Sequence, residues 1–311
     1  MADLAVVIVT WNVRALALDA LRTLFADLAA HGPEADVYVV DSASSDDTAG
    51  AVAAAFPQVH LTASADNLGF GRANNLALRQ IGFGQPGAAP LPRAVYLLNP
   101  DTLTQPGATR ALYGALMAHE RTGLVGARLM YEDGAFQHSA FRFPGLRQLW
   151  VELFPALARL YDSAFNGRYP RRLYDAGAPF PVDFVLGATM MLRREVVVQA
   201  GMFDEQFFMY CEEIDWAWRI RRAGWGVECV PAAQVTHLAG RSSGQARPHS
   251  VVSLWTSRLR LYEKYYPAWK LALARRMVAA GMARRARSAA DPALAEAYRA
   301  VERLARGRAQ A

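Results

Sequence analysis

Short apolar runs along the chain alternate with segments in which apolar residues recur every three to four positions. The runs predict buried strands, and the recurrence predicts amphipathic helices. Strands are expected at 4–10, 37–40, 59–61, 95–98, 124–130, 182–192, 226–230 and 235–237. Helices are expected at 15–30, from 44–48 onward, at 67–82, at 107–119 and just after 211. Strands that alternate with helices predict an α/β fold with a mostly parallel sheet.

The strand at 95–98 ends in residues with candidate chemistry. It stops at Asn99-Pro100-Asp101, because proline cannot donate to a sheet ladder. Those three residues alone are typical of a turn. Three other strand ends also deliver polar residues, namely Thr10 with Asn12, Asp41, and Asn67. Because ligands of open α/β sheets bind at the carboxyl edge, this succession predicts a nucleotide pocket there.

A second candidate site is acidic. Glu212, Glu213 and Asp215 fall just before or within the first turn of a predicted helix. Acids at that position interact favourably with the helix dipole, so capping alone also explains them.

The last part of the chain is helical and basic. Residues 251–266 predict a basic, aromatic helix, 269–282 a second helix, and Leu294, Tyr298, Val301 and Leu304 form the apolar stripe of a third. We therefore expect a domain at 1–250 and a C-terminal basic helical extension at 251–311. The stripe could pair with a second copy of the chain, which would give a homodimer.

Two other segments are irregular. The aromatic stretch 144–181 could form a lid or acceptor platform, or a helical insertion packed on the body, and the insertion is slightly favoured. The stretch 238–249, rich in Gly, Ser and Arg, is expected to be mobile.

Composition and charge narrow the class of protein. The 311 residues are 53% hydrophobic, which supports a large globular core. Of the net charge of +6, ten basic and three acidic residues lie from position 268 onward, so the tail carries the basicity. Such a tail can meet anionic lipid or nucleic acid, and a solvated helical surface explains it equally well. No nucleic-acid partner is expected.

The sequence also bears on location. Two cysteines give no disulfide framework, which suits a reducing compartment. No apolar run approaches the roughly 18 residues that span a bilayer, and the short run at 4–9 is a strand, not a signal peptide. We expect a cytoplasmic protein that can sit peripherally at the inner face of the membrane.

Six motifs, taken together, resemble a known family. They are VIVTWN (7–12), VVDSASSD (39–46), NLGFGRAN (67–74), LLNPD (97–101), GMFDE (201–205) and EEID (212–215) followed by Arg219. The chain resembles, over residues 4–267, a family 2 glycosyltransferase of the GT-A fold, in its rhamnosyltransferase-like branch, which builds bacterial surface polysaccharides. The resemblance implies a hexosyltransferase with a Rossmann-like, mostly parallel central sheet flanked by helices.

The resemblance also implies partners and residue roles. It implies a UDP- or dTDP-sugar donor, a divalent metal (Mg²⁺ or Mn²⁺), inversion at the anomeric carbon, and a glycan or lipid-linked acceptor. The donor-binding residues it implies are Thr10, Asn12 and Asp41 for base and ribose, Asn67, Gly69 and Arg72 near the nucleotide and its phosphates, and Asn99 and Asp101 in the D-x-D motif. The metal ligands would be Asp101 and, at even odds with a structural role, His237.

The acidic motif would supply the base. Glu213 matches the family's general base, which takes the proton of the acceptor hydroxyl. Asp215 and Glu212 would orient that base or touch the acceptor. Glu213→Gln should then abolish transfer and leave donor binding largely intact.

Three alternatives compete with this reading. Asn99 stands where many members have the first acid, so the chain could be a degenerate member that binds nucleotide-sugar without turnover. A nucleotidyltransferase on a similar sheet would need a glycine-rich basic loop after the first strand, which the sequence lacks. A dinucleotide-dependent oxidoreductase would need glycine at position 74, which is Asn74.

Overall fold

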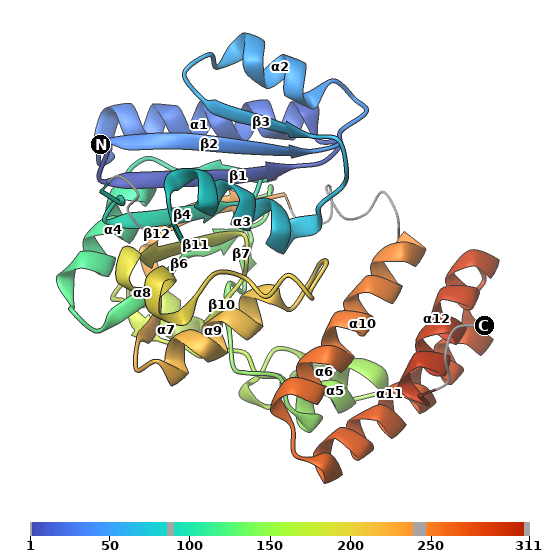
Figure 1. Ribbon diagram of the computed structural model, residues 1–311. Coiled ribbons are helices and arrows are strands. Elements are labelled where there is room, and N and C mark those ends of the chain that lie inside the picture. Colours follow the sequence, from blue (N-terminus) through green and yellow to red (C-terminus); the bar gives the residue numbers. More distant parts are fainter. Residues whose placement is uncertain (1, 86–89, 239–246, 308–311) are drawn as a thin grey trace.

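A computed structural model of the chain describes residues 2–85, 90–238 and 247–307. Figure 1 shows a body in which helices cover both faces of a central sheet, and a separate helical lobe beside it. The α/β architecture expected from the alternating pattern is confirmed. Most of the segment expected to be mobile, 239–246, lies outside the described residues.

The central sheet is parallel in its first half and mixed in its second. Its strand order is β3-β2-β1-β4-β11-β6-β12-β5, with β7 paired to β6 and β9 to β12. These strands are β1 (Leu4–Thr10), β2 (Ala35–Ser42), β3 (His60–Ser64), β4 (Ala94–Leu98), β5 (Thr102–Thr104), β6 (Thr122–Met130), β7 (Phe136–Gln137), β9 (Phe180–Pro181), β11 (Thr189–Arg193) and β12 (Gly226–His237). β1 pairs in parallel with β2 and β4, so their carboxyl ends share one edge.

Alternation along β1 explains the two layers of helices. Leu4, Val6 and Ile8 face one core, packed with α1 (Arg14–His31), α2 (Thr48–Ala55) and α4 (Ala108–Ala118). Ala5 and Val7 face the other core, packed with α3 (Gly69–Ile81), α8 (Arg194–Ala200) and α9 (Glu212–Arg222). Both faces of β1 are therefore buried, as its continuous apolar run predicts.

Two strand expectations need correction. The run 182–192 divides into β10 (Phe184–Val185), which pairs with β8 (Ala140–Phe141) in a small second sheet, and β11. The two short strands expected at 226–230 and 235–237 are one strand, β12, which continues through a register shift between Val230 and Gln234. The partner strand β6 follows both parts and holds them in line.

The helical lobe has its own core. It consists of α10 (Arg247–Tyr265), α11 (Ala268–Ser288) and α12 (Pro292–Ala305), joined by α5 (Leu146–Leu153). Side chains of all four helices meet in this core, among them Leu149, Leu153, Trp255, Leu259, Tyr262, Val278, Met282 and Val301. Tyr298, Val301 and Leu304 of the stripe on α12 pack here within the same chain, so these three residues give no support to a homodimer.

The two halves of the segment 144–181 pack in different parts of the molecule. It contains α5, α6 (Ala158–Tyr161), a 3₁₀ turn (Ala164–Asn166) and α7 (Arg171–Asp175). α5 packs on the lobe, whereas Tyr169, Tyr174 and Phe180 pack in the core of the body. The expected insertion on the body is confirmed for the later half only.

Candidate active site

A cavity of about 600 Å³ opens at the carboxyl edge of the sheet. It is lined by residues from the ends of β1, β2 and β4, the starts of α3, α9 and α10, and the end of β12. Eight of the residues singled out from the sequence line it: Thr10, Asn67, Gly69, Asn99, Asp101, Glu212, Glu213 and His237. Residues from seven elements thus converge on one cavity.

The sheet wall of the cavity consists of Thr10, Ser42, Asn67 and Gly69, with Asp41 directly behind it. Thr10 Oγ1 donates a hydrogen bond of 2.8 Å to Asp41 Oδ1. The Ser44 amide and hydroxyl also donate to Asp41, at 3.0 and 2.6 Å. Asp41 is only 3% exposed, and its carboxylate fixes both Thr10 and the loop after β2 that contains Ser44.

Gly69 allows two backbone segments to approach closely in this wall. Its φ is +69°, and a Cβ atom there would lie 2.3 Å from the carbonyl oxygen of Phe208. The Phe70 amide donates to that same oxygen at 3.1 Å, and Asn67 Oδ1 accepts from the Gly69 amide at 3.0 Å. Glycine is therefore required here.

The acidic wall consists of Asp101, His237, Glu212 and Glu213. Asp101 follows β4 and is 2% exposed, and His237 Nε2 lies 3.4 Å from its Oδ1 atom. They meet because β5 pairs antiparallel with the end of β12, which sets His237 opposite Thr102. Gln137 Oε1 lies 3.2 Å from His237 Nδ1 and holds the ring from its other side.

A metal ion would find only part of its ligand set here. Among the described residues, no group of three or more His, Cys, Asp or Glu side chains could hold a metal. Asp101 and His237 could supply two ligands, and the buried Oδ1 atom of Asn99 has no hydrogen-bond partner within the described residues. Mg²⁺ in nucleotide sites is commonly held by one or two carboxylates and substrate phosphates. The Asp101–His237 pair fits a cation whose remaining ligands come from the diphosphate of a bound nucleotide.

Two adjacent acids begin α9. The backbone at Tyr210 and Cys211 has φ of +70° and +68°, which turns the chain directly before Glu212. Burial raises the pKa of Glu213 to about 7. Burial, and then the charge of Glu213, raise the pKa of Glu212 well above its ordinary range. Within the part of the chain that the structure describes, Glu212 Oε2 has no hydrogen-bond partner. Near neutral pH this pair can hold and release a proton inside the cavity.

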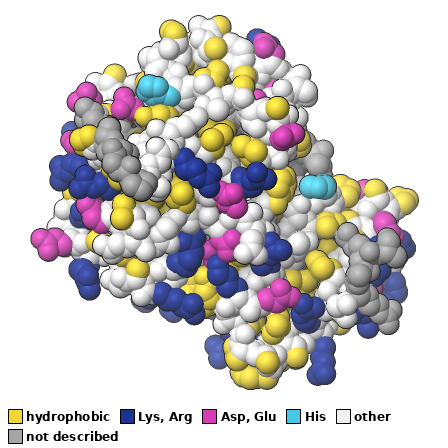
Figure 2. All heavy atoms as spheres, in the orientation of Figure 1, with side chains coloured by type: hydrophobic (Ala, Val, Ile, Leu, Met, Phe, Trp, Pro, Cys, Tyr) yellow, Lys and Arg dark blue, Asp and Glu magenta, His cyan; other side chains and the backbone are white. Residues whose placement is uncertain are grey.

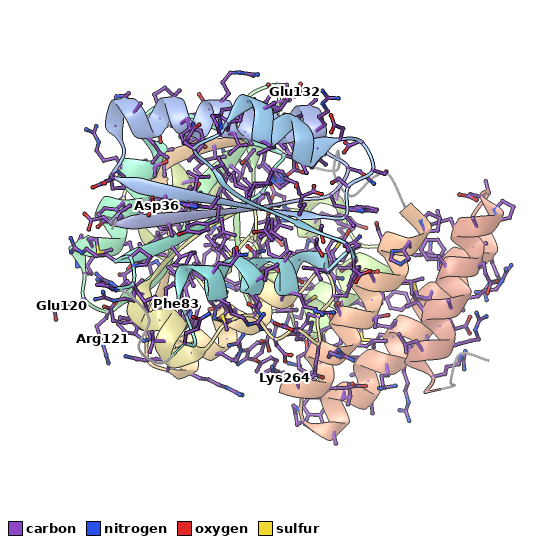
Figure 3. All side chains as sticks on the ribbon, turned by 45° about the horizontal axis from the view of Figure 1, so that its top comes forward. Asp36, Phe83, Glu120, Arg121, Glu132 and Lys264 are labelled. Atoms are coloured by element: carbon purple, nitrogen blue, oxygen red, sulfur yellow. The ribbon has the colours of Figure 1, made fainter. Side chains whose placement is uncertain are left out.

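Asp215, the third acid of the motif, faces away from the cavity. It is fully buried and contacts Arg219 Nε at 2.8 Å, Lys264 Nζ at 2.6 Å and Tyr265 Oη at 2.7 Å. Figure 3 labels Lys264, which lies where α10 borders the body. Asp215 therefore joins α9 to α10, and the geometry does not support contact with an acceptor.

Asn12 and Arg72 also lie outside the cavity lining. Asn12 Oδ1 accepts from the Ser45 amide at 2.7 Å, which ties it to the loop after β2. The Arg72 side chain is 56% exposed and lies 3.7 Å from Glu205. The geometry does not support the direct donor contacts expected of these two residues.

Other lining residues were not anticipated from the sequence. The start of α10 contributes His249 and Ser253, and the segment before α9 contributes Phe208 and Tyr210. Ser42 accepts from the Leu68 amide at 2.7 Å, and its place directly after Asp41 was the signal that could have found it. No local pattern shows that the start of α10 returns to the sheet edge.

A model of the family "Glycosyltransferase like family 2" matches residues 2–282. The chain belongs to glycosyltransferase family 2. It is therefore an enzyme of the glycosyltransferase class with the GT-A fold, as the six motifs implied. Membership also removes the oxidoreductase and nucleotidyltransferase alternatives.

Relatives share the family. The chain is 32% identical over 213 residues to an N-acetylglucosaminyl-diphospho-decaprenol L-rhamnosyltransferase of Mycobacterium tuberculosis, across 67% of this chain and 68% of the relative. It is 28% identical over 191 residues to a low-salt glycan biosynthesis hexosyltransferase of Haloferax volcanii, across 60% and 54%. Rhamnosyltransferase WbbL of Escherichia coli is 40% identical over only 58 residues, 19% and 22% of the chains.

A solved structure supports the fold. The mannosyltransferase PcManGT from Pyrobaculum calidifontis, in complex with GDP-Man and Mn²⁺, aligns with a TM-score of 0.52 over 96% of this chain and 86% of its own. At 18% identity the likeness concerns the fold alone. No helix in the described part of the chain is long and apolar enough to cross a membrane.

Proposed function

We propose that this enzyme transfers a sugar, rhamnose in the first instance, from a nucleotide diphosphate-sugar to a glycan or lipid-linked acceptor, with inversion, in cell-surface polysaccharide synthesis. One observation carries the proposal. Glu213, whose burial raises its pKa to about 7, shares one cavity with the Asp101–His237 pair. The Mycobacterium tuberculosis relative, named for rhamnosyl transfer to a lipid-linked N-acetylglucosamine, supports the choice of sugar and acceptor.

The donor would span the two walls. The sheet wall would hold the base and ribose of a UDP- or dTDP-sugar, through Thr10 and Asn67. Asp101 and His237 would hold the Mg²⁺ or Mn²⁺ ion, with Asn99 beside them. When bound, that cation neutralises charge on the departing nucleotide diphosphate.

Glu213 would act as general base. Its carboxylate takes the proton of the acceptor hydroxyl while the acceptor oxygen forms a bond to the anomeric carbon. The bond from that carbon to the phosphate oxygen breaks, and the nucleotide diphosphate leaves. Glu212, kept protonated by burial and by its neighbour, can donate a hydrogen bond in the same cavity.

A lipid-linked acceptor would place the reaction at the inner face of a membrane. The basic C-terminal extension is the part of the chain that we propose for peripheral contact. Tyr298, Val301 and Leu304 of the α12 stripe pack inside the lobe, so we do not propose a homodimer through this stripe.

Asn99 favours a second candidate, a member that binds nucleotide-sugar without turnover. Its amide brings no charge to the part of the cavity that Asp101 and His237 line. Metal-dependent transfer separates the two candidates.

The test is a transfer assay on the full chain. Purified protein would be incubated with dTDP-rhamnose, UDP-sugars or GDP-mannose, a polyprenyl-diphosphate N-acetylglucosamine acceptor, and Mn²⁺, Mg²⁺ or chelator. The proposal expects one pyrimidine donor to give a metal-dependent product with inverted anomeric configuration. Donor binding without any product would support the non-catalytic candidate, and retention of configuration would contradict the mechanism.

A further inference from the structure

The outer surface of α11 is basic. This helix of 21 residues contains six basic residues and no acidic one. Its buried side, which includes Val278 and Met282, packs in the lobe core. The other side carries Trp269, Leu273 and Arg276 and continues toward the end of the helix with exposed residues every three to four positions.

We define the outer stripe as Trp269, Leu273, Arg276, Arg284 and Arg287, all of which are exposed. Trp269 is 67% exposed and Leu273 is 42% exposed, which is unusual for large apolar side chains. Figure 2 shows hydrophobic side chains gathered at the lower end of the lobe, where Figure 1 draws the passage from α10 to α11.

Within the described residues, no acidic side chain neutralises the three arginines of the outer stripe. Across residues 2–85, 90–238 and 247–307, none of the three forms an ion pair with an acidic side chain. The inward basic residues of α11 are engaged instead: Arg275 pairs with Glu263, and Lys270 lies 3.8 Å from the ring centre of Tyr266.

The neighbouring helix α12 provides the contrast. Arg299 and Arg303 pair with Glu296, at 3.1 and 2.8 Å, and Arg306 pairs with Glu302 at 3.0 Å. Among the described residues, the two arginines of α12 and Arg306 at its C-cap are thus all paired with acids of the same helix, whereas α11 has five arginines and no acid of its own.

We propose that the outer stripe of α11 lies on an anionic lipid bilayer, with Trp269 and Leu273 in the interface and the three arginines against phosphate headgroups. A helix with an aromatic and an aliphatic anchor and a basic surface suits the interfacial plane of a membrane. A second copy of the chain would bring the same unpaired cations, which repel. A nucleic acid would match the arginines and leave the two apolar side chains without a partner.

Helix α10 connects the cavity to the outer stripe. α10 lines the cavity with His249 and Ser253 near its first turn and leads into α11 at its other end. Its 19 residues span about 28 Å, so the cavity lies within about one helix length of the surface. This inference rests on the proposed function for its purpose, which is to bring a lipid-linked acceptor within reach, and its binding test needs no substrate.

The test is co-sedimentation of the full chain with vesicles of phosphatidylglycerol and phosphatidylcholine, or of phosphatidylcholine alone. The chain should bind the anionic vesicles and lose affinity as salt rises. Replacing Arg276, Arg284 and Arg287 together by alanine should weaken binding about 100-fold at low salt, since each cation near the surface contributes roughly fivefold.

The matched control replaces Arg299, Arg303 and Arg306 by alanine, which removes the same charge from α12. It should weaken binding only slightly, because those cations are already paired. Equal losses in the two triple variants would overturn the proposal, since charge alone would then explain binding.

Trp269→Ala tests the apolar anchor. It should weaken vesicle binding several-fold more than Tyr131→Ala, whose side chain is 44% exposed on the body. Equal effects of the two, or binding of duplex DNA as tight as that of anionic vesicles, would overturn the proposal. Donor binding measured on the same variants separates this question from the proposed function. A variant that loses vesicle binding and keeps donor binding would show an effect on α11 alone. A wild-type chain that binds no donor would count against the proposed active site and not against the outer stripe.

Discussion

The two walls of the cavity differ in whether their polar groups have hydrogen-bond partners. In the sheet wall, polar groups already bond to one another: Thr10 and Ser44 donate to Asp41, and Asn67 accepts from Gly69. Glu212 in the acidic wall and Asn99 beside it keep buried oxygens without hydrogen-bond partners in the described part of the chain.

This difference indicates that the two walls have different roles. A wall whose hydrogen bonds are complete is rigid and can position a ligand without reorganising. A wall with raised carboxyl pKa values and unsatisfied oxygens can accept a cation or a proton. We therefore expect substitutions in the acidic wall to affect turnover far more than substitutions around the sheet wall.

The largest effect should come from Glu213→Gln. The amide keeps the shape of the side chain and cannot take a proton, so kcat should fall about 10³-fold while the Kd for donor stays within about twofold. Steady-state transfer and calorimetric donor titration would measure both. Glu195→Gln, a similar change at an exposed position on α8, should leave kcat unchanged. Loss of donor binding in the folded Glu213 variant would refute its role as base.

Asp101→Ala should act on donor binding first. Removing the carboxylate should lower metal-dependent donor affinity about 100-fold, because it leaves His237 as the remaining ligand of the pair. Donor titrations with Mn²⁺ and with chelator would show whether the metal-dependent gain disappears. Asp175→Ala, at an exposed ion pair, is the control. An undiminished gain in Asp101→Ala would remove this residue from the metal site.

Asp215→Asn should weaken the fold more than the cavity. The neutral amide would leave the partly buried cations of Arg219 and Lys264 undercompensated, so the free energy of unfolding should fall by about 3 kcal/mol. Urea denaturation measures it. Asp183→Asn, at the more exposed pair with Arg221, should cost less than about 1 kcal/mol. Similar values for the two variants would show that Asp215 does not join α9 to α10.

The pH dependence of stability should reveal the acidic wall. The pKa of Glu213 is raised from 4.5 to about 7, so the folded state binds this proton more tightly than the unfolded state. Stability should therefore decline as pH rises through that window. In Glu213→Gln the decline in Tm should be shallower. An identical pH profile for wild type and variant would contradict the raised pKa.

The smallest effect should come from Arg72→Ala. This exposed side chain points to Glu205 instead of the cavity, so transfer should change by less than about twofold. A tenfold rise in KM for donor would show that Arg72 swings to the phosphates once the donor is bound.

Several elements could be predicted from the sequence because their signals are local. The strand Leu4–Thr10 was predicted to the residue, since its apolar run is continuous and ends at a polar turn. The continuous course of β12 could not be predicted from the sequence, because its register shift depends on pairing with β6.

The site was predictable as a set of residues but not as a geometry. The contact of Asp101 with His237 depends on β5, which has three residues and shows no periodicity. Asp215 stood out in its motif, yet Lys264 and Tyr265, which hold it, come from a helix far along the chain. Such long-range partners are set by packing between elements, which a single sequence does not display.

The central claim is that this cavity binds a nucleotide-sugar together with a divalent metal. The most direct measurement is the Tm of the purified full chain with dTDP-, UDP- and GDP-sugars, each with Mn²⁺, Mg²⁺ or chelator. A ligand that binds only the folded state raises Tm by mass action. We expect Tm to rise with a pyrimidine nucleotide-sugar, and only when the metal is present. No rise with any of these donors, in protein that unfolds cooperatively, would contradict it.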